Sequence, residues 1–202
     1  MALDTYAALQ TSIANTLHRA DLSSSILDFI TLADSRINCD LRVRQMETTQ
    51  ASTIAAGVLA VPSNYIELLD AYISSTSPYG SLTRKTSNWI YDNYPQRSAD
   101  QQPRFIAREG SSFIFGPFPD SNYTVILVYY NRFKSLSAEL NSIFSSYPGL
   151  WLYAALCESA PFLKNDQRIP MWEAKYKYLF DLIQKESDDE YISGDVLQVV
   201  PG

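Results

Sequence analysis

Apolar residues in the first part of the chain recur at spacings of three and four, which is the spacing of one face of a helix. One set is Tyr6, Leu9, Ile13 and Leu17, and the next is Ile26, Ile30, Ala33, Ile37 and Leu41. The stretch "RADLSS" interrupts the pattern between the two sets. Asp4, and then Ser23 or Ser24, stand where a side-chain oxygen can cap a helix start. The short link predicts two antiparallel neighbouring helices.

From Met46 the pattern changes to short β-rich runs separated by Gly, Pro, Asp and Asn. "VLAVP" predicts a short strand, and "YIELLDAYIS" fits a helical or a strand period but lies among strands. "TSNWIYDNYP" predicts a short helical turn that Pro95 ends. "RFIAR", "FIFGPFP" and "YTVILVYY" predict an antiparallel meander, in which the almost continuously apolar run Val125–Tyr130 is the best candidate for a central strand.

The helical pattern resumes after Phe133. "YPGLWLYAALCESAPFL" has apolar residues on more than one side, which predicts a helix buried between neighbours. The final helix has a clean apolar stripe, with Asp166 ahead of it as a candidate cap and Pro170 in its first turn. We expect this helix to end at Ser187, because the acidic "SDDE" follows. Its stripe consists of Trp172, Tyr176, Leu179 and Ile183.

These patterns predict an α+β fold. The N- and C-terminal helices, residues 1–45 and 135–187, form one helical bundle. Residues 46–134 form an antiparallel β lobe inserted into it, and residues 188–202 form an extended C-terminal tail.

Composition and charge narrow the range of possible functions. With 46% hydrophobic and 19% charged residues, the chain has a globular composition. Its net charge of −6 and the lack of a run of Lys or Arg argue against tight nucleic-acid binding. Fourteen Tyr suit protein interfaces. Neither a signal-peptide pattern nor an apolar stretch of eighteen residues occurs, so we expect no membrane partner.

Few residues could carry catalysis or hold a metal. His18 is the sole His, and the two Cys, Cys39 and Cys157, are expected to be small buried groups inside helices in a reducing compartment. These residues do not supply the Ser–His or Cys–His arrangement of a nucleophilic enzyme or a zinc ligand set. No glycine-rich phosphate loop occurs. We therefore expect no cofactor, no metal site and no enzymatic activity.

Glu158 stands out because it lies among apolar residues in "LCESAPFLKNDQRIPMW". We expect it to pair with an Arg of the first two helices, such as Arg36 or Arg42. One alternative is a glycan hydrolase that uses Glu158 with Arg168 or Lys164. Such an enzyme would need a second carboxylate at a set separation, for which the sequence offers Asp166 and Glu173.

Four stretches resemble the head–tail adaptor family of short-tailed bacteriophages (podoviruses), the proteins related to tail tubular protein A. The resemblance runs from about Tyr6 to about Lys185 and leaves the C-terminal tail outside it. The stretches are "LHRADLSSSILDFITLADSRINCDLRVRQME", "VPSNYIELLDAYI", "GPFPDSNYTVILVYY" and "YPGLWLYAALCESAPFLKNDQRIPMWEAKY".

The resemblance implies a structural protein of the virion, made in the host cytoplasm and placed at the head–tail junction. Such adaptors form a dodecameric ring below the portal, extend the DNA channel and dock the tail nozzle, and the genome passes without specific binding. The loop Ser74–Ser81 then becomes a candidate nozzle contact and the tail a candidate portal contact. Another ring component, such as a tail-completion or stopper protein, is the alternative. The candidate residues are Ser77, Pro78 and Tyr79 in the loop, and Val196, Leu197, Val199, Val200 and Pro201 in the tail.

Overall fold

The computed structural model describes residues 3–19, 21–76, 80–98, 100–163 and 166–193, without the side chains of 191–193. The fold is α+β, as the sequence predicts, and the chain divides into two compact units. One is a helical unit of Met1–Met46 and Phe133–Gly202, and the other is a β unit, Glu47–Arg132, inserted between its two parts.

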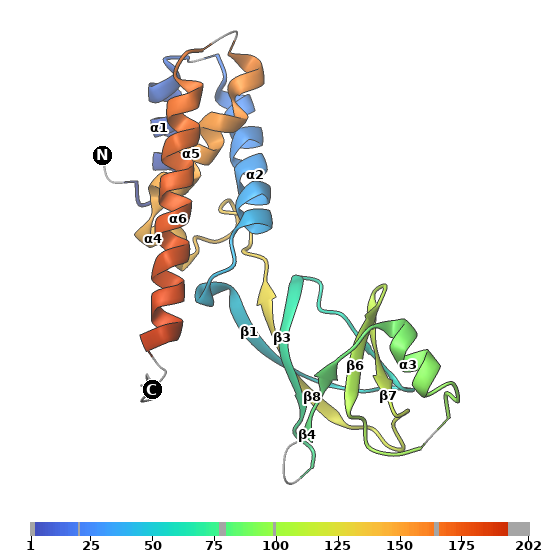
Figure 1. Ribbon diagram of the computed structural model, residues 1–202. Coiled ribbons are helices and arrows are strands. Elements are labelled where there is room, and N and C mark those ends of the chain that lie inside the picture. The colour runs from blue at the N-terminus through green and yellow to red at the C-terminus, as the bar shows by residue number, and fades with distance from the viewer. Residues whose placement is uncertain (1–2, 20, 77–79, 99, 164–165, 194–202) are drawn as a thin grey trace. The chain divides into compact units, whose positions relative to one another are not determined.

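The helical unit is built around α5, Pro148–Glu158, which packs against α1, α2, α4 and α6 (Figure 1). Pro148 occupies the first turn of α5, where its missing N–H costs no hydrogen bond. Trp151 and Leu156 are both fully buried although they lie on different sides of α5, so its apolar surface is covered on more than one side. The other elements are α1 (Tyr6–Leu17), α2 (Ser23–Asp40), η1 (Arg44–Met46), α4 (Ser142–Ser146), η2 (Ala160–Phe162) and α6 (Ile169–Ser193).

Two predicted helix caps are wrong. Thr5 rather than Asp4 caps α1, because its side chain accepts a hydrogen bond from Ala8 N at 3.1 Å. The N-cap of α2 is Leu22, which makes no side-chain cap bond, and Ser23 already lies inside the helix.

The predicted end of the last helix is also wrong, because α6 continues through "SDDE" to Ser193. Ser187 is buried, and its hydroxyl accepts a hydrogen bond from Arg44 N at 3.1 Å. Gln184 donates to Asp188 one turn further on, and Glu190 lies 3.8 Å from Arg44. Acidic residues near a helix C-terminus disfavour the helix because they interact unfavourably with its dipole. These contacts offset that effect, so α6 extends past its acidic residues. The rest of the predicted tail, residues 194–202, lies outside the described residues.

The β unit contains two four-stranded sheets, with strand orders β1-β8-β3-β4 and β2-β7-β6-β5. As predicted, β8 is a central strand, and it pairs antiparallel with β1 and β3. The short helix predicted before Pro95 is α3, Ser87–Asn93. The strands are β1 (Glu47–Thr53), β2 (Val58–Ala60), β3 (Tyr65–Ile73), β4 (Gly80–Ser81), β5 (Thr83–Arg84), β6 (Phe105–Glu109), β7 (Ser112–Gly116) and β8 (Thr124–Asn131).

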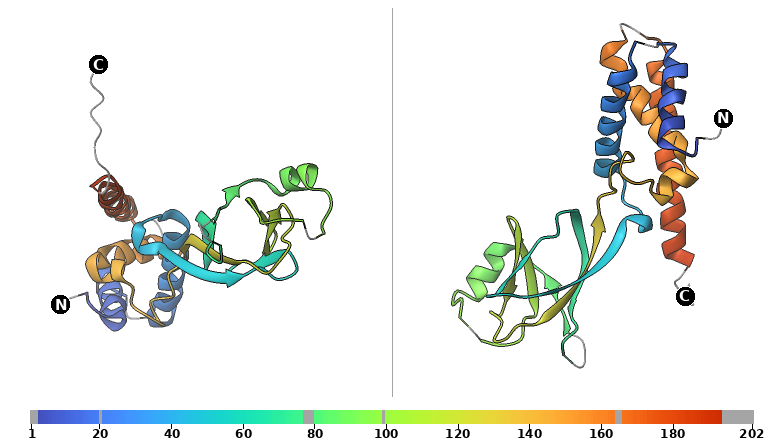
Figure 2. Two further views of the ribbon diagram at one scale, coloured as in Figure 1. Left: turned by 90° about the horizontal axis from the view of Figure 1, so that it is seen from below. Right: turned by 180° about the vertical axis from the view of Figure 1, so that it is seen from behind.

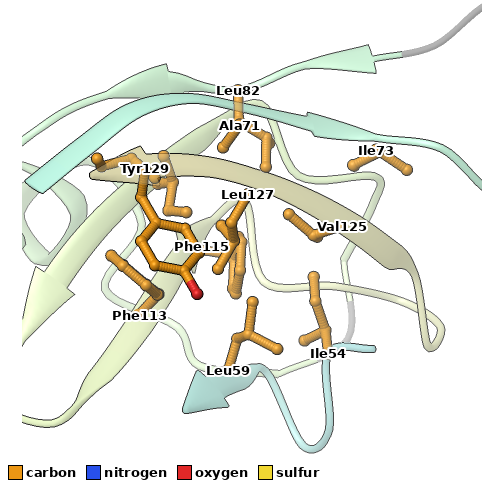
Figure 3. Close-up of a cluster of buried hydrophobic side chains, with 12 residues drawn as sticks. Ile54, Leu59, Ala71, Ile73, Leu82, Phe113, Phe115, Val125, Leu127 and Tyr129 are labelled. Atoms are coloured by element: carbon orange, nitrogen blue, oxygen red, sulfur yellow. The ribbon is translucent and has the colours of Figure 1, made fainter. Parts of the chain in front are cut away.

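The predicted meander is right for β6 and β7 but wrong for β8. β6 and β7 form an antiparallel hairpin, whereas the chain after Gly116 crosses to the other sheet before β8 begins. The sheets are also not purely antiparallel, because β5 pairs parallel with β6. The crossing lets β8 face the other sheet, so that Leu127 and Tyr129 share one buried cluster with Phe113 and Phe115 (Figure 3).

A tight turn joins β1 to β2. Ala55 and Val58 form a β-bridge, and both residues between them have positive φ, 50° at Ala56 and 75° at Gly57. Two successive positive φ angles are typical of a type I′ hairpin turn, in which glycine is favoured. A side chain at Gly57 would also collide with Phe118, whose ring lies 2.2 Å from the position of a Cβ.

The helical unit holds the chain by hydrogen bonds at both points where it joins the β unit. Before β1, Arg44 N donates to Ser187 of α6. After β8, Phe133 N donates to Asn38 Oδ1 of α2 at 2.8 Å. The helical unit therefore holds its own chain just before and just after the inserted β unit.

Candidate interaction surfaces

Glu158 pairs with Arg36, which confirms the prediction of an Arg partner from the first two helices. Arg36 Nη1 lies 3.4 Å from Glu158 Oε1, and the same guanidinium lies 3.7 Å from Glu173 and 3.9 Å from Asp40. It also stacks 4.3 Å from the ring centroid of Tyr176, whose hydroxyl donates to Asp40 at 3.0 Å. Burial, together with Asp40, raises the pKa of Tyr176 well above its usual range. The cluster holds α2, α5 and α6 together.

Among the residues of the hydrolase alternative, Glu158 and Glu173 share Arg36, whereas Asp166 and Arg168 pair with each other. Arg168 binds Asp166 through several hydrogen bonds of 2.6–3.1 Å, and it donates to the Thr16 carbonyl at 2.8 Å. This ion pair lowers the pKa of Asp166. Asp166 also accepts a hydrogen bond from Arg168 N at 2.9 Å, just ahead of α6. Arg168 is thus engaged with Asp166 while Glu158 is engaged with Arg36; Lys164 lies outside the described residues.

The cysteines and the histidine form no reactive centre. Cys157 is buried in α5, and burial raises the pKa of its thiol to about 11, which disfavours the nucleophilic thiolate. Cys39 is exposed on α2, so the expectation that both cysteines are buried is wrong for it. His18 is exposed and forms the left-handed C-cap of α1. Within the described ranges, no group of three His, Cys, Asp or Glu could hold a metal ion.

Asp34 of α2 is a buried carboxylate that was not among the predicted site residues. It accepts hydrogen bonds from Trp151 Nε1 at 2.7 Å, Ser135 Oγ at 2.9 Å and Leu136 N at 3.2 Å. Burial raises the pKa of Asp34, and these three hydrogen bonds oppose the shift. Its position in the sequence indicates burial, since Asp34 lies four residues after Ile30 on the apolar face of α2. The arrangement is structural, because every described donor belongs to the bundle.

A groove of about 520 Å³ runs between α2 and α6, and we call it the α2–α6 groove. Tyr176 and Phe180 supply its apolar part. Three carboxylates lie within 4 Å of a single guanidinium at its Arg36 end, so the negative charge there exceeds the positive charge. The lining residues are Arg36, Asp40, Glu173, Ala174, Tyr176, Lys177, Phe180 and Asp181.

Another flank of α6 carries exposed apolar side chains, and we call it the α6 ridge. Met171 is 53% exposed, Tyr178 63% and Leu182 39%. Spacings of seven and four residues place them on one side of the helix. The exposed Lys175 and Lys185 lie among them. The ridge was not among the predicted sites, although the spacing of its apolar residues indicates a second apolar stripe beside the buried one.

Beside the ridge, a second groove of about 610 Å³ lies between α6 and the start of α5. Leu182 and Lys185 of the ridge line it together with Tyr147, whose hydroxyl donates to Glu186. The second groove therefore borders the ridge, and Tyr147 supplies its aromatic side chain.

The candidate contact residues from the sequence lie outside the described residues. They are Ser77, Pro78 and Tyr79 of the loop, and Val196, Leu197, Val199, Val200 and Pro201 of the tail. Within the described ranges, no helix has both the length and the apolar character that crossing a membrane requires.

Comparison with models of known protein families gives a match. The family model described as SU10 adaptor protein matches residues 4–198, which is nearly the whole chain. A search of curated proteins found no match.

Proposed function

The chain belongs to the SU10 adaptor protein family, a family of bacteriophage adaptor proteins, and we propose that it is the head–tail adaptor of a podovirus-like virion. In this role it forms a homo-oligomeric, dodecameric ring below the portal, extends the DNA channel and attaches the tail nozzle. It acts as a structural protein of the virion and not as an enzyme.

The observation that carries this proposal is the extent of the family match. A match over residues 4–198 includes both units, so the likeness does not rest on one shared element. The bundle supports it further, because its exposed features are a ridge and grooves that suit protein contacts. The carboxylates Glu158, Asp166 and Asp34 are engaged in ion pairs and hydrogen bonds within the bundle.

We assign the contacts by unit. The helices build the ring and contact the portal, with the C-terminal segment around Val196–Pro201 reaching the portal. The β unit contacts the nozzle through the loop around Ser77–Tyr79. The net charge of −6 supports a channel along which DNA slides, because an acidic wall repels the phosphate backbone.

Electron cryomicroscopy of the virion, and of the full chain mixed with its portal protein, tests the proposal. We expect a ring of this protein directly below the portal ring. The proposal fails if virions contain no such ring and the chain stays monomeric when mixed with the portal. A ring elsewhere in the tail would instead favour a tail-completion or stopper protein.

A further inference from the structure

We propose that neighbouring copies bind each other by inserting the α6 ridge of one copy into the α2–α6 groove of the next. This inference rests on the proposed function, since it supposes that copies assemble. Beyond the proposed function, it identifies the two surfaces that meet and the head-to-tail order in which neighbouring copies bind.

The ridge has the composition of a protein contact. Tyr178 is more exposed than any other large apolar side chain in the described part of the chain, and Met171 and Leu182 extend the same apolar strip (Figure 2 shows α6 from two further sides). Tyr is enriched among the residues that dominate binding energy, because its ring buries a large area at a small entropy cost. Lys175 and Lys185 form no ion pair with the described residues, so their charges are available to a partner.

The groove offers the complementary features. Tyr176 and Phe180 give it an apolar floor, and three carboxylates around Arg36 leave an excess of negative charge. Asp181 adds another carboxylate, eight residues beyond Glu173 on α6, or about 12 Å along the helix axis. Lys177 also lines the groove, so four carboxylates face two cations and the excess of negative charge remains. The two ridge lysines are ten residues apart, or about 15 Å. Both sets of charges are thus spaced by a similar length along the same helix.

The two surfaces lie on opposite sides of α6. Glu173 and Phe180 of the groove each follow a ridge residue, Met171 and Tyr178, by two positions. Each residue turns a helix by about 100°, so the two sets are separated by about 200° around its axis. One copy therefore presents its ridge to one neighbour and its groove to another. A contact between two different surfaces is heterologous, and it generates a ring when the rotation closes.

A second copy of this chain is the occupant that the charges favour. An excess of carboxylates repels nucleic acid, whereas the lysines that match the groove are present on every copy. The contact would also cover Tyr178, Met171 and Leu182, which one copy leaves exposed.

Cysteine cross-linking tests the geometry in the full chain. The background variant is Cys39→Ser, because Cys39 is exposed while Cys157 is buried. Leu182→Cys marks the ridge and leaves Tyr178 in place, and Lys177→Cys marks the groove. After mixing the two variants with the portal and adding a short bismaleimide, we expect cross-linked dimers. Each variant alone should give none, and dimers from Leu182→Cys alone would overturn the proposal in favour of a symmetric ridge-to-ridge contact.

Substitutions test the energy of the contact. Tyr178→Ala and Lys175→Glu should each weaken self-association at least about tenfold, because each removes a central element of the contact. Leu27→Ala is the matched control. Leu27 is 45% exposed on α2, and it lies nine residues from Arg36, about 180° around that helix, so we expect no change. Circular dichroism of each variant verifies that the fold is retained.

The outcomes separate this inference from the proposed function. If a ring forms on the portal but the mixed variants give no cross-link, or if Tyr178→Ala and Leu27→Ala behave alike, the surfaces are wrongly assigned and the adaptor role stands. If virions lack the ring and the unmodified chain neither self-associates nor joins the portal, the proposed function fails and this inference fails with it.

Discussion

Two acidic residues of the bundle show how its hydrogen-bond and ion-pair partners affect the charge of a buried carboxylate. Asp34 is nearly buried and is held by three neutral hydrogen-bond donors, whereas Glu158 is half-buried and is held by a guanidinium. Neutral donors offset only part of the cost of burying a charge, so the pKa of Asp34 is raised. A cation stabilises the charge directly, which explains how an isolated Glu is accommodated between helices.

The raised pKa of Asp34 predicts a pH dependence. The native state binds the Asp34 proton more tightly than the unfolded chain does. Its contribution to stability is therefore complete below the pKa of the unfolded carboxyl and is lost as the pH rises through the raised native pKa. Asp34→Asn lacks this titration. We expect wild type to lose stability relative to Asp34→Asn as the pH rises above about 4, the usual pKa of an unfolded Asp.

Urea unfolding titrations at several pH values measure this difference. Because both proteins share every other titrating group, the comparison isolates Asp34. A difference in the free energy of unfolding that stays constant with pH, or that changes in favour of wild type, would show that the native pKa is not raised.

Glu158 tests the structural role against the catalytic one. Glu158→Gln keeps an oxygen that accepts from Arg36, so we expect a loss of about 1 kcal/mol or less in unfolding free energy. Arg36→Gln should cost more, about 1–3 kcal/mol, because three carboxylates lose their shared cation. Chemical denaturation measures both losses, and we expect portal assembly of Glu158→Gln to be normal. A variant that assembles normally but loses a measured hydrolase activity would support an enzyme instead.

At the scale of elements, periodicity predicted the helices well, because the buried faces of α1, α2 and α6 follow a simple spacing. The strand partners were less predictable. The runs that became β7 and β8 are neighbours in the sequence, yet they lie in different sheets, since pairing is decided by long-range contacts between Leu127, Phe113 and their neighbours. The end of α6 escaped prediction for a similar reason: Arg44, distant in sequence, holds Ser187.

The candidate surfaces also differ in how far the sequence predicts them. The Arg partner of Glu158 could be predicted from residue types, because a cation on a neighbouring helix stabilises a carboxylate among apolar residues. The α2–α6 groove could not, because a hollow depends on how the side chains of two helices pack, which residue types alone do not indicate.

The turn between β1 and β2 gives a prediction at this scale. Ala56 adopts a positive φ that alanine disfavours, so Ala56→Gly should stabilise the β unit by about 0.5–1 kcal/mol. Gly57→Ala should destabilise it by about 2 kcal/mol or more, since positive φ combines with a clash against Phe118. Hydrogen exchange of peptides covering β1 and β2 measures both effects. Equal effects of the two substitutions would contradict the assigned turn.

At the scale of the whole molecule, charge predicts how the chain behaves toward DNA. A net charge of −6, without a run of Lys or Arg to neutralise phosphates, disfavours binding driven by counterion release. In electrophoretic mobility assays we expect no retardation of double-stranded DNA, even at about 50 mM salt, where electrostatic binding is strongest. Retardation that disappears as salt is added would show a basic path for DNA and would contradict a channel that DNA only slides through.

The insertion of the β unit has a mechanical consequence. The chain enters and leaves the β unit through two separate crossings. A pulling force on the β unit is therefore shared between these two segments of the chain. Each crossing is anchored, one by Ser187 of α6 and the other by Asn38 of α2, so the load passes into two helices of the bundle. A single proteolytic cut at either crossing would leave the two units covalently joined. The attachment of the β unit therefore tolerates the failure of one crossing.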